Sequence, residues 1–448
     1  MAVKEYKNPP EYTDIVSEPE MFYSSLFPPE TEDVADGKLN VVSLFSGCGG
    51  MDVGIEGGFI CHKNSITNPD LVEDSINNDW VRLKPNGMKT VFACDILPEA
   101  RTAWLNYMVK RRLDPSVYHL ESVVELVRRH KKGERVFPEK VDIVTGGFPC
   151  QDFSVAGKRR GFESKVSHDG RKEGVTDDKN LSRGKLYLWM KEVIEITQPN
   201  IFIAENVKGL VSLGDVKRII QEDFSKAGGD GYYVFDPQVL HAANYGVPES
   251  RERVIFIGIK KNALRPDVLK ALEESDNVPA YLNPYPKPTH SNDPESGLSR
   301  FVSCEDVLGG LKEPEESIDP SHHFYSKAKY LTNGTQGQTE INFKGIGPTI
   351  RAEHHGNIEF RRLSFENGGK NEKELELGMK QRRLSPRECA LIQTFPPDYN
   401  FVLYHPSRRG FAVSPSMAYK IIGNAVPPLL AYNIASRIEQ LWPVYFQN

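Results

Sequence analysis

The sequence predicts an α/β fold in which a doubly wound, mostly parallel sheet is accompanied by a second, smaller domain. Between residues 39 and 260, short apolar runs typical of buried parallel strands alternate with segments of helical periodicity. After residue 262 the composition changes, because 279–294 hold five prolines and 333–371 are rich in Gly, Asn and Gln. The length of 448 residues leaves room for two or three such units.

Six strands are expected in the first unit. The run LNVVSLF at 39–45 is a short apolar segment of the kind that parallel sheets bury on both faces. Similar runs predict strands at 89–95, 141–147 and 200–206, near 232–240, and at 253–260. Helices between the strands are expected to cover both faces of the sheet.

Helices are expected where apolar residues recur at intervals of three and four. A short helix follows a glycine-rich turn within 47–59, and an amphipathic helix is expected over 97–113. The clearest helical pattern lies between the third and fourth strands, at Leu186, Trp189, Met190, Val193, Ile194 and Thr197. Later, Ser385 can cap a helix over 385–393 with Glu388 three residues on, and 418–442 contains another amphipathic helix.

Composition excludes several classes of protein. Hydrophobic residues are 39% and charged residues 26%, which is typical of a globular protein. Mean hydropathy is −0.46, and no stretch approaches the roughly 18 apolar residues of a membrane span. The six cysteines form no CxxC pair, and the acidic N-terminus does not match a signal peptide, so we expect a reducing cytoplasm.

Charge is distributed unevenly along the chain. A net charge of −5 argues, at face value, against a nucleic-acid partner, because phosphate binding usually requires a basic surface. Residues 1–38, however, carry nine acidic residues and three lysines, so this extension accounts for the whole excess. The rest of the chain is near neutral, and two of its segments, 157–185 and 380–409, each net +4. Charge therefore leaves a nucleic-acid partner open.

Three features of the first unit could carry chemistry. The loop FSGCGG (45–50) lies between a strand and a helix, where glycines let a backbone approach a ligand, although a simple tight turn has the same pattern. Asp95 ends the second strand, a position that commonly holds a ribose. Cys150 follows the third strand and is either a covalent nucleophile or an inert buried thiol.

The surrounding motifs favour the nucleophile. GGFPCQDFS (146–154) resembles the nucleophile motif of the DNA (cytosine-5) methyltransferases, of the bacterial restriction–modification type. Five further segments resemble that family's motifs and occur in the family's order: 42–59, 203–210 (IAENVKGL), 244–259, 382–396 and 419–431 (YKIIGNAVPPLLA). The resemblance implies a Rossmann-like, methyltransferase-type sheet with a smaller target-recognition domain.

The resemblance also implies how the reaction proceeds. Carbon 5 of cytosine is a poor nucleophile, and a thiolate adding to carbon 6 would activate it. By resemblance Cys150 is that thiolate, and Glu205, positioned by Asn206, meets N3 and the exocyclic amine of the base. Arg251 and Arg253 would hold the flipped base and shape its pocket. The target must leave the base stack to reach Cys150.

The implied cofactor is S-adenosylmethionine. The residues assigned to it are Phe45, Gly47, Gly49, Asp95, Phe148, Leu186, Asn424 and Ala425. Ser43 stands where many members have Asp, Asp95 where most have Glu, and Glu249 where a Gln often precedes the two arginines. The family's adenine-contacting carboxylate has no clear counterpart, and Glu121 is the nearest candidate.

DNA contacts are expected on both sides of the site. The residues assigned to DNA are Gln151, Ser154, Arg159 and Arg160 near the nucleophile, and Thr349 and Arg351 in the recognition segment. The two basic segments, 157–185 and 380–409, are expected to contact phosphates. His354 and His355 either face bases or are ordinary surface residues, and no metal-ligand spacing accompanies them.

The predicted protein is a two-domain enzyme that methylates C5 of a flipped cytosine in a specific duplex DNA sequence. An acidic extension (1–38) precedes the catalytic domain, which is formed by 39–262 with 411–448, and 263–410 form the target-recognition domain. A bacterial cytoplasmic monomer is expected, with a cognate restriction endonuclease as a partner and no membrane association. Two alternatives remain: a tRNA cytosine-5 methyltransferase on the same fold, and a non-catalytic DNA-binding homologue.

Overall fold

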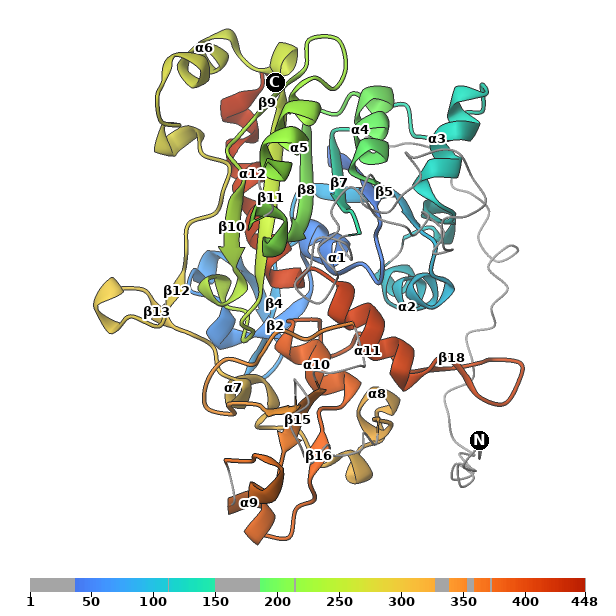
Figure 1. Cartoon of the computed structure of the whole chain (residues 1–448), viewed down its shortest axis with the longest axis vertical. Coiled ribbons are helices and arrows are strands. Elements are labelled where there is room, and N and C mark those ends of the chain that lie inside the picture. Colours follow the sequence, from blue (N-terminus) through green and yellow to red (C-terminus); the bar gives the residue numbers. More distant parts are fainter. Residues whose placement is uncertain are drawn as a thin grey trace.

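The chain folds into a larger half around a central sheet and a smaller half of short helices and strands, which lies below the sheet in Figure 1. The computed structural model describes residues 37–111, 113–149, 186–212, 215–326, 338–352, 358–370 and 373–447.

An eight-stranded mixed sheet forms the larger half, in the order β10-β11-β8-β7-β1-β5-β6, with β9 also paired to β11. Its strands are β1 (Leu39–Leu44), β5 (Met88–Asp95), β6 (Tyr118–Leu120), β7 (Ile143–Gly147), β8 (Ile201–Val207), β9 (Tyr232–Val234), β10 (Gln238–His241) and β11 (Glu252–Lys260). Five neighbouring strands, from β6 to β8, run parallel, and β11 is antiparallel to β8.

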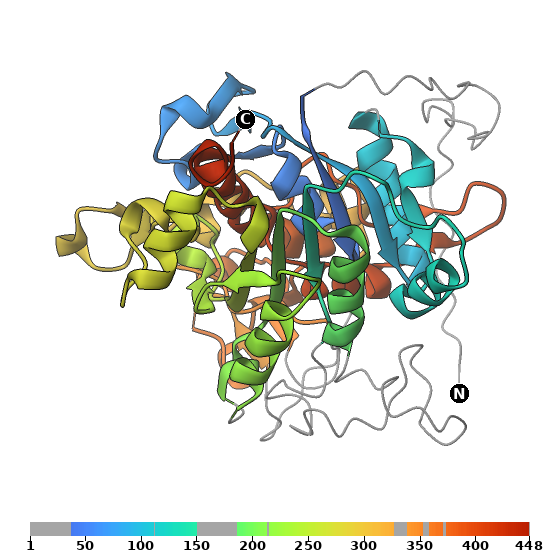
Figure 2. The ribbon, with the colours of Figure 1, turned by 90° about the horizontal axis from the view of Figure 1, so that it is seen from above.

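Helices cover both faces of this sheet (Figure 2). They are α1 (Gly50–Glu56), α2 (Pro98–Met108), α3 (Val123–Lys131), α4 (Leu186–Thr197), α5 (Val216–Ser225) and α12 (Pro428–Tyr445). Side chains of a strand alternate between the faces, so Val41 packs in the cluster with α1, α2 and α12, whereas Val42 packs in the cluster with α3, α4 and α5. The predicted doubly wound α/β fold is confirmed.

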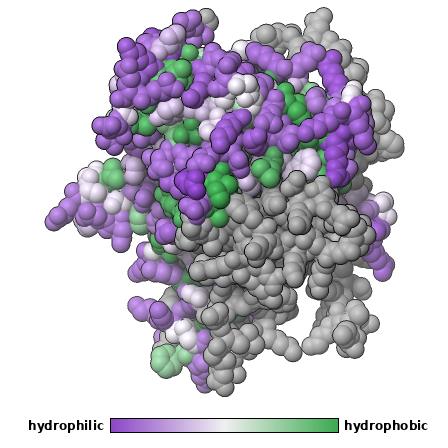
Figure 3. Space-filling model, turned by 45° about the horizontal axis from the view of Figure 1, so that its top comes forward, coloured by the Kyte–Doolittle hydropathy of each residue, from purple (hydrophilic) through white to green (hydrophobic). Residues whose placement is uncertain are grey.

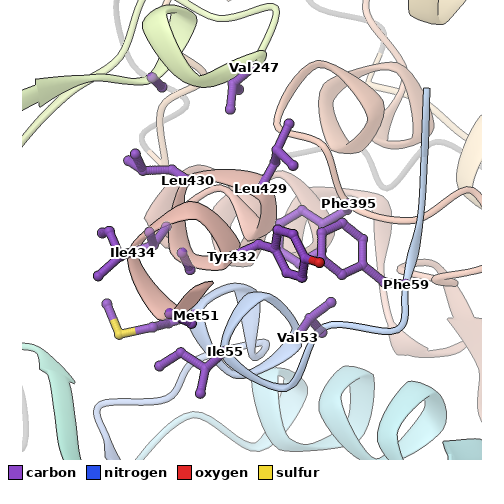
Figure 4. Close-up of a cluster of buried hydrophobic side chains, with 14 of the residues drawn as sticks. Met51, Val53, Ile55, Phe59, Val247, Phe395, Leu429, Leu430, Tyr432 and Ile434 are labelled. Atoms are coloured by element: carbon purple, nitrogen blue, oxygen red, sulfur yellow. The ribbon is translucent and has the colours of Figure 1, made fainter. Parts of the chain in front are cut away.

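The first and last helices of the sheet domain pack against each other (Figure 4). Phe59, just after α1, meets Tyr432 of α12 edge to face, with ring centroids 5.8 Å apart. A Cβ atom on Gly54 would lie 2.2 Å from the carbonyl oxygen of Pro428, so only glycine permits this approach. The two helices therefore depend on each other for close packing.

Two expected elements differ in detail. The single strand near 232–240 is divided into β9 and β10, because Pro237 has no N–H to donate and interrupts the ladder on β11. The segment 418–442 holds parts of two helices, α11 (Pro415–Asn424) and α12, since the Pro427–Pro428 pair ends one helix and begins the next.

Two further segments surround the sheet. The polar insertion expected at 60–88 contains a small antiparallel sheet of β2 (Ile60–His62), β3 (Val72–Ser75) and β4 (Trp80–Leu83). Helix α6 (Pro266–Glu274) follows β11, and Arg265 N–H donates to the Tyr445 carbonyl at 2.9 Å. Residues just beyond the predicted boundary at 262 thus contact α12, and the domain limits stay predictions.

The smaller half consists of short elements. They are β12 (His290–Ser291), β13 (Ser299–Arg300), α7 (Cys304–Leu308), α8 (Pro320–His323), β14 (Gln338–Glu340), β15 (Ile358–Arg362), α9 (Lys373–Glu376), β16 (Arg382–Arg383), α10 (Pro386–Ile392), β17 (Leu403–Tyr404) and β18 (Phe411–Val413). The expected cap of α10 is confirmed, because Glu388 N–H donates to Ser385 Oγ at 3.1 Å and Ser385 N–H to Glu388 Oε2 at 2.7 Å.

Buried ion pairs join these short elements. The Arg382 guanidinium donates to both oxygens of Glu388, at 2.7 and 2.9 Å, and through Nε to Glu313 at 2.9 Å. Arg362 links Glu313 to Glu374. We call Arg362, Arg382, Glu313, Glu374 and Glu388 the arginine network.

The network corrects one expectation about DNA contacts. Arg382, Arg383 and Arg387, counted within the basic segment 380–409, are at most 4% exposed. Arg387 pairs with Asp319 at 2.6 Å, and the Arg383 guanidinium lies over the Tyr419 ring at 4.1 Å. The expectation that these three contact phosphates is wrong, because packing and carboxylates already surround them.

The described surface is largely polar. In the view of Figure 3, hydrophilic side chains dominate the described area and hydrophobic ones form small separate patches. Among the helices described, none is both long and apolar enough to cross a membrane.

Candidate functional site

The sheet has its topological switch point between β1 and β7. From β1 the chain adds β5 and β6 on one side, and it then returns to add β7 and β8 on the other. In open α/β sheets, ligands bind outside the carboxyl ends of the strands at such a point. The loops that follow β1 and β7 are therefore the place to look for a site.

The loop after β1 has the backbone conformation of a ligand cradle. Phe45, Gly47 and Gly49 all have positive φ, at 54°, 54° and 78°. A Cβ on Gly49 would lie 2.5 Å from Cδ1 of Trp104, so the loop has no room for a side chain there. Phe45 adopts this conformation without being glycine, which costs energy and is common at functional sites.

Asp95 lies directly beside this loop. Its Oδ2 accepts a hydrogen bond from Gly47 N–H at 3.0 Å, and its Oδ1 accepts one from Leu97 N–H at 3.0 Å. Burial raises the pKa of Asp95. The structure thus brings together two residues that the sequence assigned to one cofactor, although a small sheet lies between them in the chain.

The apolar residues assigned to the cofactor share one cluster. Phe148 and Leu186 are each 3% exposed, and Phe45 packs against the same cluster. The Phe148 ring lies 6.2 Å from that of Tyr187. Residues from β1, β7 and α4 therefore meet on one face of the sheet at its carboxyl edge.

The turn after α11 reaches the same loop. A Cβ on Gly50 would lie 3.1 Å from the Ala425 Cβ and 2.2 Å from the Val426 carbonyl oxygen, so this turn lies against the start of α1. Asn424 is exposed and Ala425 half-buried. The two residues assigned to the methionine end are thus next to the glycine-rich loop.

A buried carboxylate beneath the loop escaped sequence reasoning. Asp52 accepts hydrogen bonds from Ser43 Oγ at 2.6 Å and from Trp104 Nε1 at 2.7 Å. Burial raises its pKa to about 6. Ser43, noted as a departure from the family pattern, therefore supports the loop through Asp52. The available signal was an acid in the first turn of a short helix.

Glu121, the candidate adenine contact, follows β6. Leu120 is paired with Asp95 in the sheet, so Glu121 lies close to the carboxyl edge. Its Oε2 accepts a hydrogen bond from Arg129 at 2.6 Å. The adenine contact stays a prediction.

Glu205 and Arg253 form a pair at the carboxyl end of β8. Arg253 Nε lies 2.7 Å from Glu205 Oε1, and their side chains are 11% and 10% exposed. Burial raises the pKa of Glu205, and the nearby arginines only partly oppose it. A Cβ on Gly147 would lie 2.8 Å from Glu205 Oε2. The carboxyl therefore faces the end of β7, three residues before Cys150.

Asn206 fixes the chain that leads to the nucleophile. It is 1% exposed, and its Nδ2 donates to the Phe148 carbonyl at 3.1 Å. Its Oδ1 accepts from Val207 N–H at 2.9 Å. Asn206 therefore holds the chain at Phe148, and its predicted role of positioning Glu205 stays a prediction.

Arg251 is fully buried among protein groups. Its Nη1 donates to the Ile350 carbonyl at 2.9 Å, and its Nη2 donates to the carbonyls of Gly423 and Ala425 at 2.9 and 2.7 Å. Burial lowers its pKa to about 10. Arg251 thus joins the recognition segment to the turn after α11, whereas Arg253 meets Glu205. Contact of either arginine with a base stays a prediction.

Thr349 and Arg351 lie on a segment that pairs with the chain before β11. Ile350 N–H donates to Glu249 Oε1 at 2.7 Å, Ser250 N–H donates to the Gly347 carbonyl at 2.8 Å, and Thr349 Oγ1 donates to the Ser250 carbonyl. Arg351 is exposed. Glu249, whose role was open, therefore anchors the recognition segment.

Several predicted site residues lie outside the described residues. They are Cys150, Gln151, Ser154, Arg159, Arg160, His354 and His355, together with the whole of the basic segment 157–185. The nearest described residues on either side of Cys150 in the chain are Pro149 and Leu186.

Comparison with known proteins agrees with this arrangement. A family model described as C-5 cytosine-specific DNA methylase matches residues 118–440. Type II methyltransferase M.BsuRI of Bacillus subtilis is 31% identical over 434 residues, covering 93% of this chain and 83% of that protein. Type II methyltransferase M.HhaI of Haemophilus parahaemolyticus is 28% identical over 319 residues, covering 68% and 79%.

Solved structures share the fold. A putative DNA modification methyltransferase encoded within a prophage (E. coli) aligns with a TM-score of 0.52 at 19% identity, covering 91% of this chain and 100% of that one. The S. pombe Dnmt2 methyltransferase aligns with a TM-score of 0.50 at 16% identity, covering 90% and 99%.

Proposed function

The chain belongs to the C-5 cytosine-specific DNA methylase family, and from that premise we propose that it methylates a flipped cytosine in a specific duplex DNA sequence through a covalent bond to Cys150. One observation carries the proposal. Glu205 and Arg253 are paired at 2.7 Å, are nearly buried, and lie beside the strand that leads to Cys150. Burial raises the pKa of this carboxyl, and buried carboxyls with shifted pKa values cluster at catalytic sites.

In the proposed reaction the Cys150 thiolate adds to carbon 6 of the cytosine, and carbon 5 becomes nucleophilic. Glu205, with its raised pKa, shares a proton with N3 as electrons move toward that atom. After methylation a base removes the proton from carbon 5, the carbon 6–sulfur bond breaks, and the thiolate is restored. Arg253 holds Glu205 in place, and Asn206 holds the Phe148 carbonyl.

The residues at the carboxyl edge fit S-adenosylmethionine. Nothing lies within 4 Å of the position that a Cβ on Gly47 would take, so the backbone there is open to a ligand. The Asp95 carboxylate, which accepts a hydrogen bond from Gly47 N–H, ends the second strand, where a ribose hydroxyl pair commonly binds. The residues proposed to hold the cofactor are Phe45, Gly47, Gly49, Asp95, Phe148, Leu186, Asn424 and Ala425. When bound, the cofactor supplies a methyl group on an electron-poor sulfonium.

The covalent step has a direct test. Cys150→Ser should abolish transfer of tritiated methyl to duplex DNA while cofactor binding is kept, and DNA containing 5-fluorocytosine should trap the wild-type chain as an adduct, since fluorine cannot leave as a proton. Cys61→Ser, which changes a buried thiol of β2, is the matched control and should stay active. Full activity of Cys150→Ser would contradict the mechanism.

The two alternatives make different predictions in the same assay. A tRNA cytosine-5 methyltransferase would label tRNA in preference to duplex DNA. A non-catalytic homologue would bind DNA and label neither. The nearly buried Glu205–Arg253 pair at the carboxyl edge of the sheet favours an enzyme, because titratable groups with shifted pKa values cluster at active sites.

The setting that we propose is a bacterial cytoplasm. The relatives named above include bacterial Type II methyltransferases, and the described cysteines are all free and buried, which suits a reducing compartment. We further propose a monomer with a cognate restriction endonuclease acting on the same sequence. Sedimentation and methylome sequencing of expressing cells would test the oligomeric state and the target.

A further inference from the structure

The strands β17 and β18 form a hairpin that extends from the body of the protein. Leu403 pairs with Val413 and Tyr404 with Phe411, and His405 N–H donates to the Gly410 carbonyl at 3.0 Å. Figures 1 and 2 show its loop, residues 405–410, reaching outward beyond α11 in both views. The hairpin presents a short, closed loop to the surroundings.

Aromatic rings support the base of the hairpin. Tyr404 and Phe411 stack with ring centroids 5.2 Å apart and planes 21° from parallel. Phe324 meets Phe411 edge to face at 5.2 Å and Tyr404 at 6.1 Å. Stacked and edge-to-face pairs each add stability beyond their burial, so the loop stands on a packed base.

The loop carries two exposed cations. Arg408 and Arg409 are exposed, and no carboxylate of the described residues forms an ion pair with either one. Of the other four basic residues of 380–409, three are buried and Lys380 lies 3.7 Å from Glu315. Residues 399–413 contain no acidic side chain. The positive charge of this segment is therefore concentrated at the hairpin tip.

The hairpin lies on the same side of the sheet as the candidate site. Strand β18 packs against α2, which begins just after Asp95. After β18, Ser414 caps α11, and that helix ends at Asn424, next to the glycine-rich loop. Two arginines without carboxylate partners thus extend from the edge at which the site is built.

We propose that this hairpin is a phosphate-binding arm, in which Arg408 and Arg409 contact backbone phosphates of duplex DNA beside the target site. The proposal rests on the proposed function, because it takes duplex DNA as the ligand. A guanidinium presents several N–H donors to phosphate oxygens, and such contacts position a duplex without reading its sequence. The arm therefore contributes affinity and leaves the choice of cytosine to other residues.

The salt dependence of binding measures these contacts directly. For wild type and Arg408→Gln/Arg409→Gln, the dissociation constant of a duplex containing the target is measured over a range of salt concentrations. The logarithm of the association constant falls linearly with the logarithm of the salt concentration, with a slope of about −0.9 for each phosphate contact. The double variant should therefore have a slope less steep than that of wild type by about 1.8. Its KM for DNA should rise about tenfold at low salt, with kcat at saturating DNA and the methylated sequence unchanged.

Two control variants separate local contact from general charge. Lys132→Gln/Lys226→Gln removes two exposed cations at the C-terminal ends of α3 and α5, which lie at the opposite edge of the sheet, and it should keep the wild-type slope. Arg408→Lys/Arg409→Lys keeps the charge and should keep most of the slope.

The outcomes distinguish this proposal from the proposed function. An unchanged slope in the Arg408→Gln/Arg409→Gln variant, or an equal loss in Lys132→Gln/Lys226→Gln, overturns the arm while wild-type methylation of DNA stands. A wild-type chain that does not bind duplex DNA overturns both.

Discussion

The pKa values of carboxylates are shifted in opposite directions at the sheet edge and in the arginine network. At the sheet edge burial raises the pKa values of Asp52, Asp95, Glu205 and Glu249. In the network, arginines lower the pKa values of Glu313, Glu374 and Glu388 despite burial. The difference lies in how fully cations compensate each carboxylate, because Arg382 alone gives Glu388 two hydrogen bonds.

This contrast indicates different roles for the two regions. A carboxyl with a raised pKa can share or take up a proton near neutral pH, as a site requires. A carboxylate with a lowered pKa stays charged and holds its neighbours in place. The sheet edge is thus suited to reaction, whereas the network is suited to joining the short elements of the smaller half.

The largest expected effect on stability comes from breaking the network. Glu388→Ala leaves the buried Arg382 without its main partner, and loss of one partner of a buried pair costs about 3–5 kcal/mol of the free energy of unfolding. Denaturant unfolding measures this loss. Glu315→Ala removes an exposed carboxylate 3.7 Å from Lys380 and should change stability by less than about 1 kcal/mol. Equal effects in the two variants would contradict the assigned role of the network.

At the sheet edge the largest effect should be on activity. Glu205→Gln removes the proton-sharing group, and kcat should fall about 10²–10⁴-fold while stability changes far less than in Glu388→Ala. The matched control is Glu252→Gln. Glu252 directly precedes Arg253, its side chain is exposed and pairs with Lys208, and the variant should stay active. Steady-state methylation with both variants tests this, and comparable kcat values would remove Glu205 from the mechanism.

Asp52 should make the free energy of unfolding depend on pH. Its pKa is raised from 3.8 to about 6, so the folded chain binds this proton more tightly than the unfolded chain does. Its contribution to stability is complete below pH about 4 and is lost as pH rises through about 6, a change of about 2–3 kcal/mol. Asp52→Asn should lack this change. The free energy of unfolding of wild type and of Asp52→Asn is measured between pH 4 and 7. If the two curves run parallel over this range, the prediction is contradicted.

Glu313 should show the opposite sign and a smaller effect. Its pKa is lowered to about 2 by Arg362 and Arg382, so its contribution is present above pH about 4.5 and is lost as pH falls toward 2. Because the carboxylate is partly exposed, Glu313→Gln should cost about 1 kcal/mol at pH 7. The midpoint temperatures of thermal unfolding of wild type and Glu313→Gln should converge as pH falls toward 2. If their difference grows at low pH instead, the stabilising role assigned to the Glu313 carboxylate is wrong.

Local patterns predicted much of the fold and part of the site. Apolar runs located four of the five parallel strands and missed the three-residue β6, and Ser385 with Glu388 located the start of α10. The correct predictions depend on nearby residues. Asp95 and the glycine loop, assigned from the sequence to one cofactor, lie together in the structure because the ends of adjacent parallel strands meet, and the assignment itself stays a prediction.

Partners distant in the chain were not predictable. Glu388, six residues after Arg382, was expected only as a helix cap, and the other partners, Glu313 of Arg382 and Asp319 of Arg387, lie 69 and 68 residues away. The charge of the two arginines therefore resembled that of the exposed Arg408. Arg251 likewise looked like a base-binding residue, and its carbonyl partners at Ile350 and Gly423 become visible only in three dimensions. Burial of a charge is decided by tertiary contacts, which residue spacing does not encode.

The packing of α1 against α12 has a consequence for biosynthesis. Helix α1 leaves the ribosome well before its partner α12 is translated, and the carbonyls of Gly423 and Ala425 are likewise made well after Arg251, which they bind. The nascent chain must therefore keep the apolar face of α1 uncovered until α12 has been translated, which favours binding by chaperones. A chain truncated before α12 should leave this face exposed and yield no active methylase.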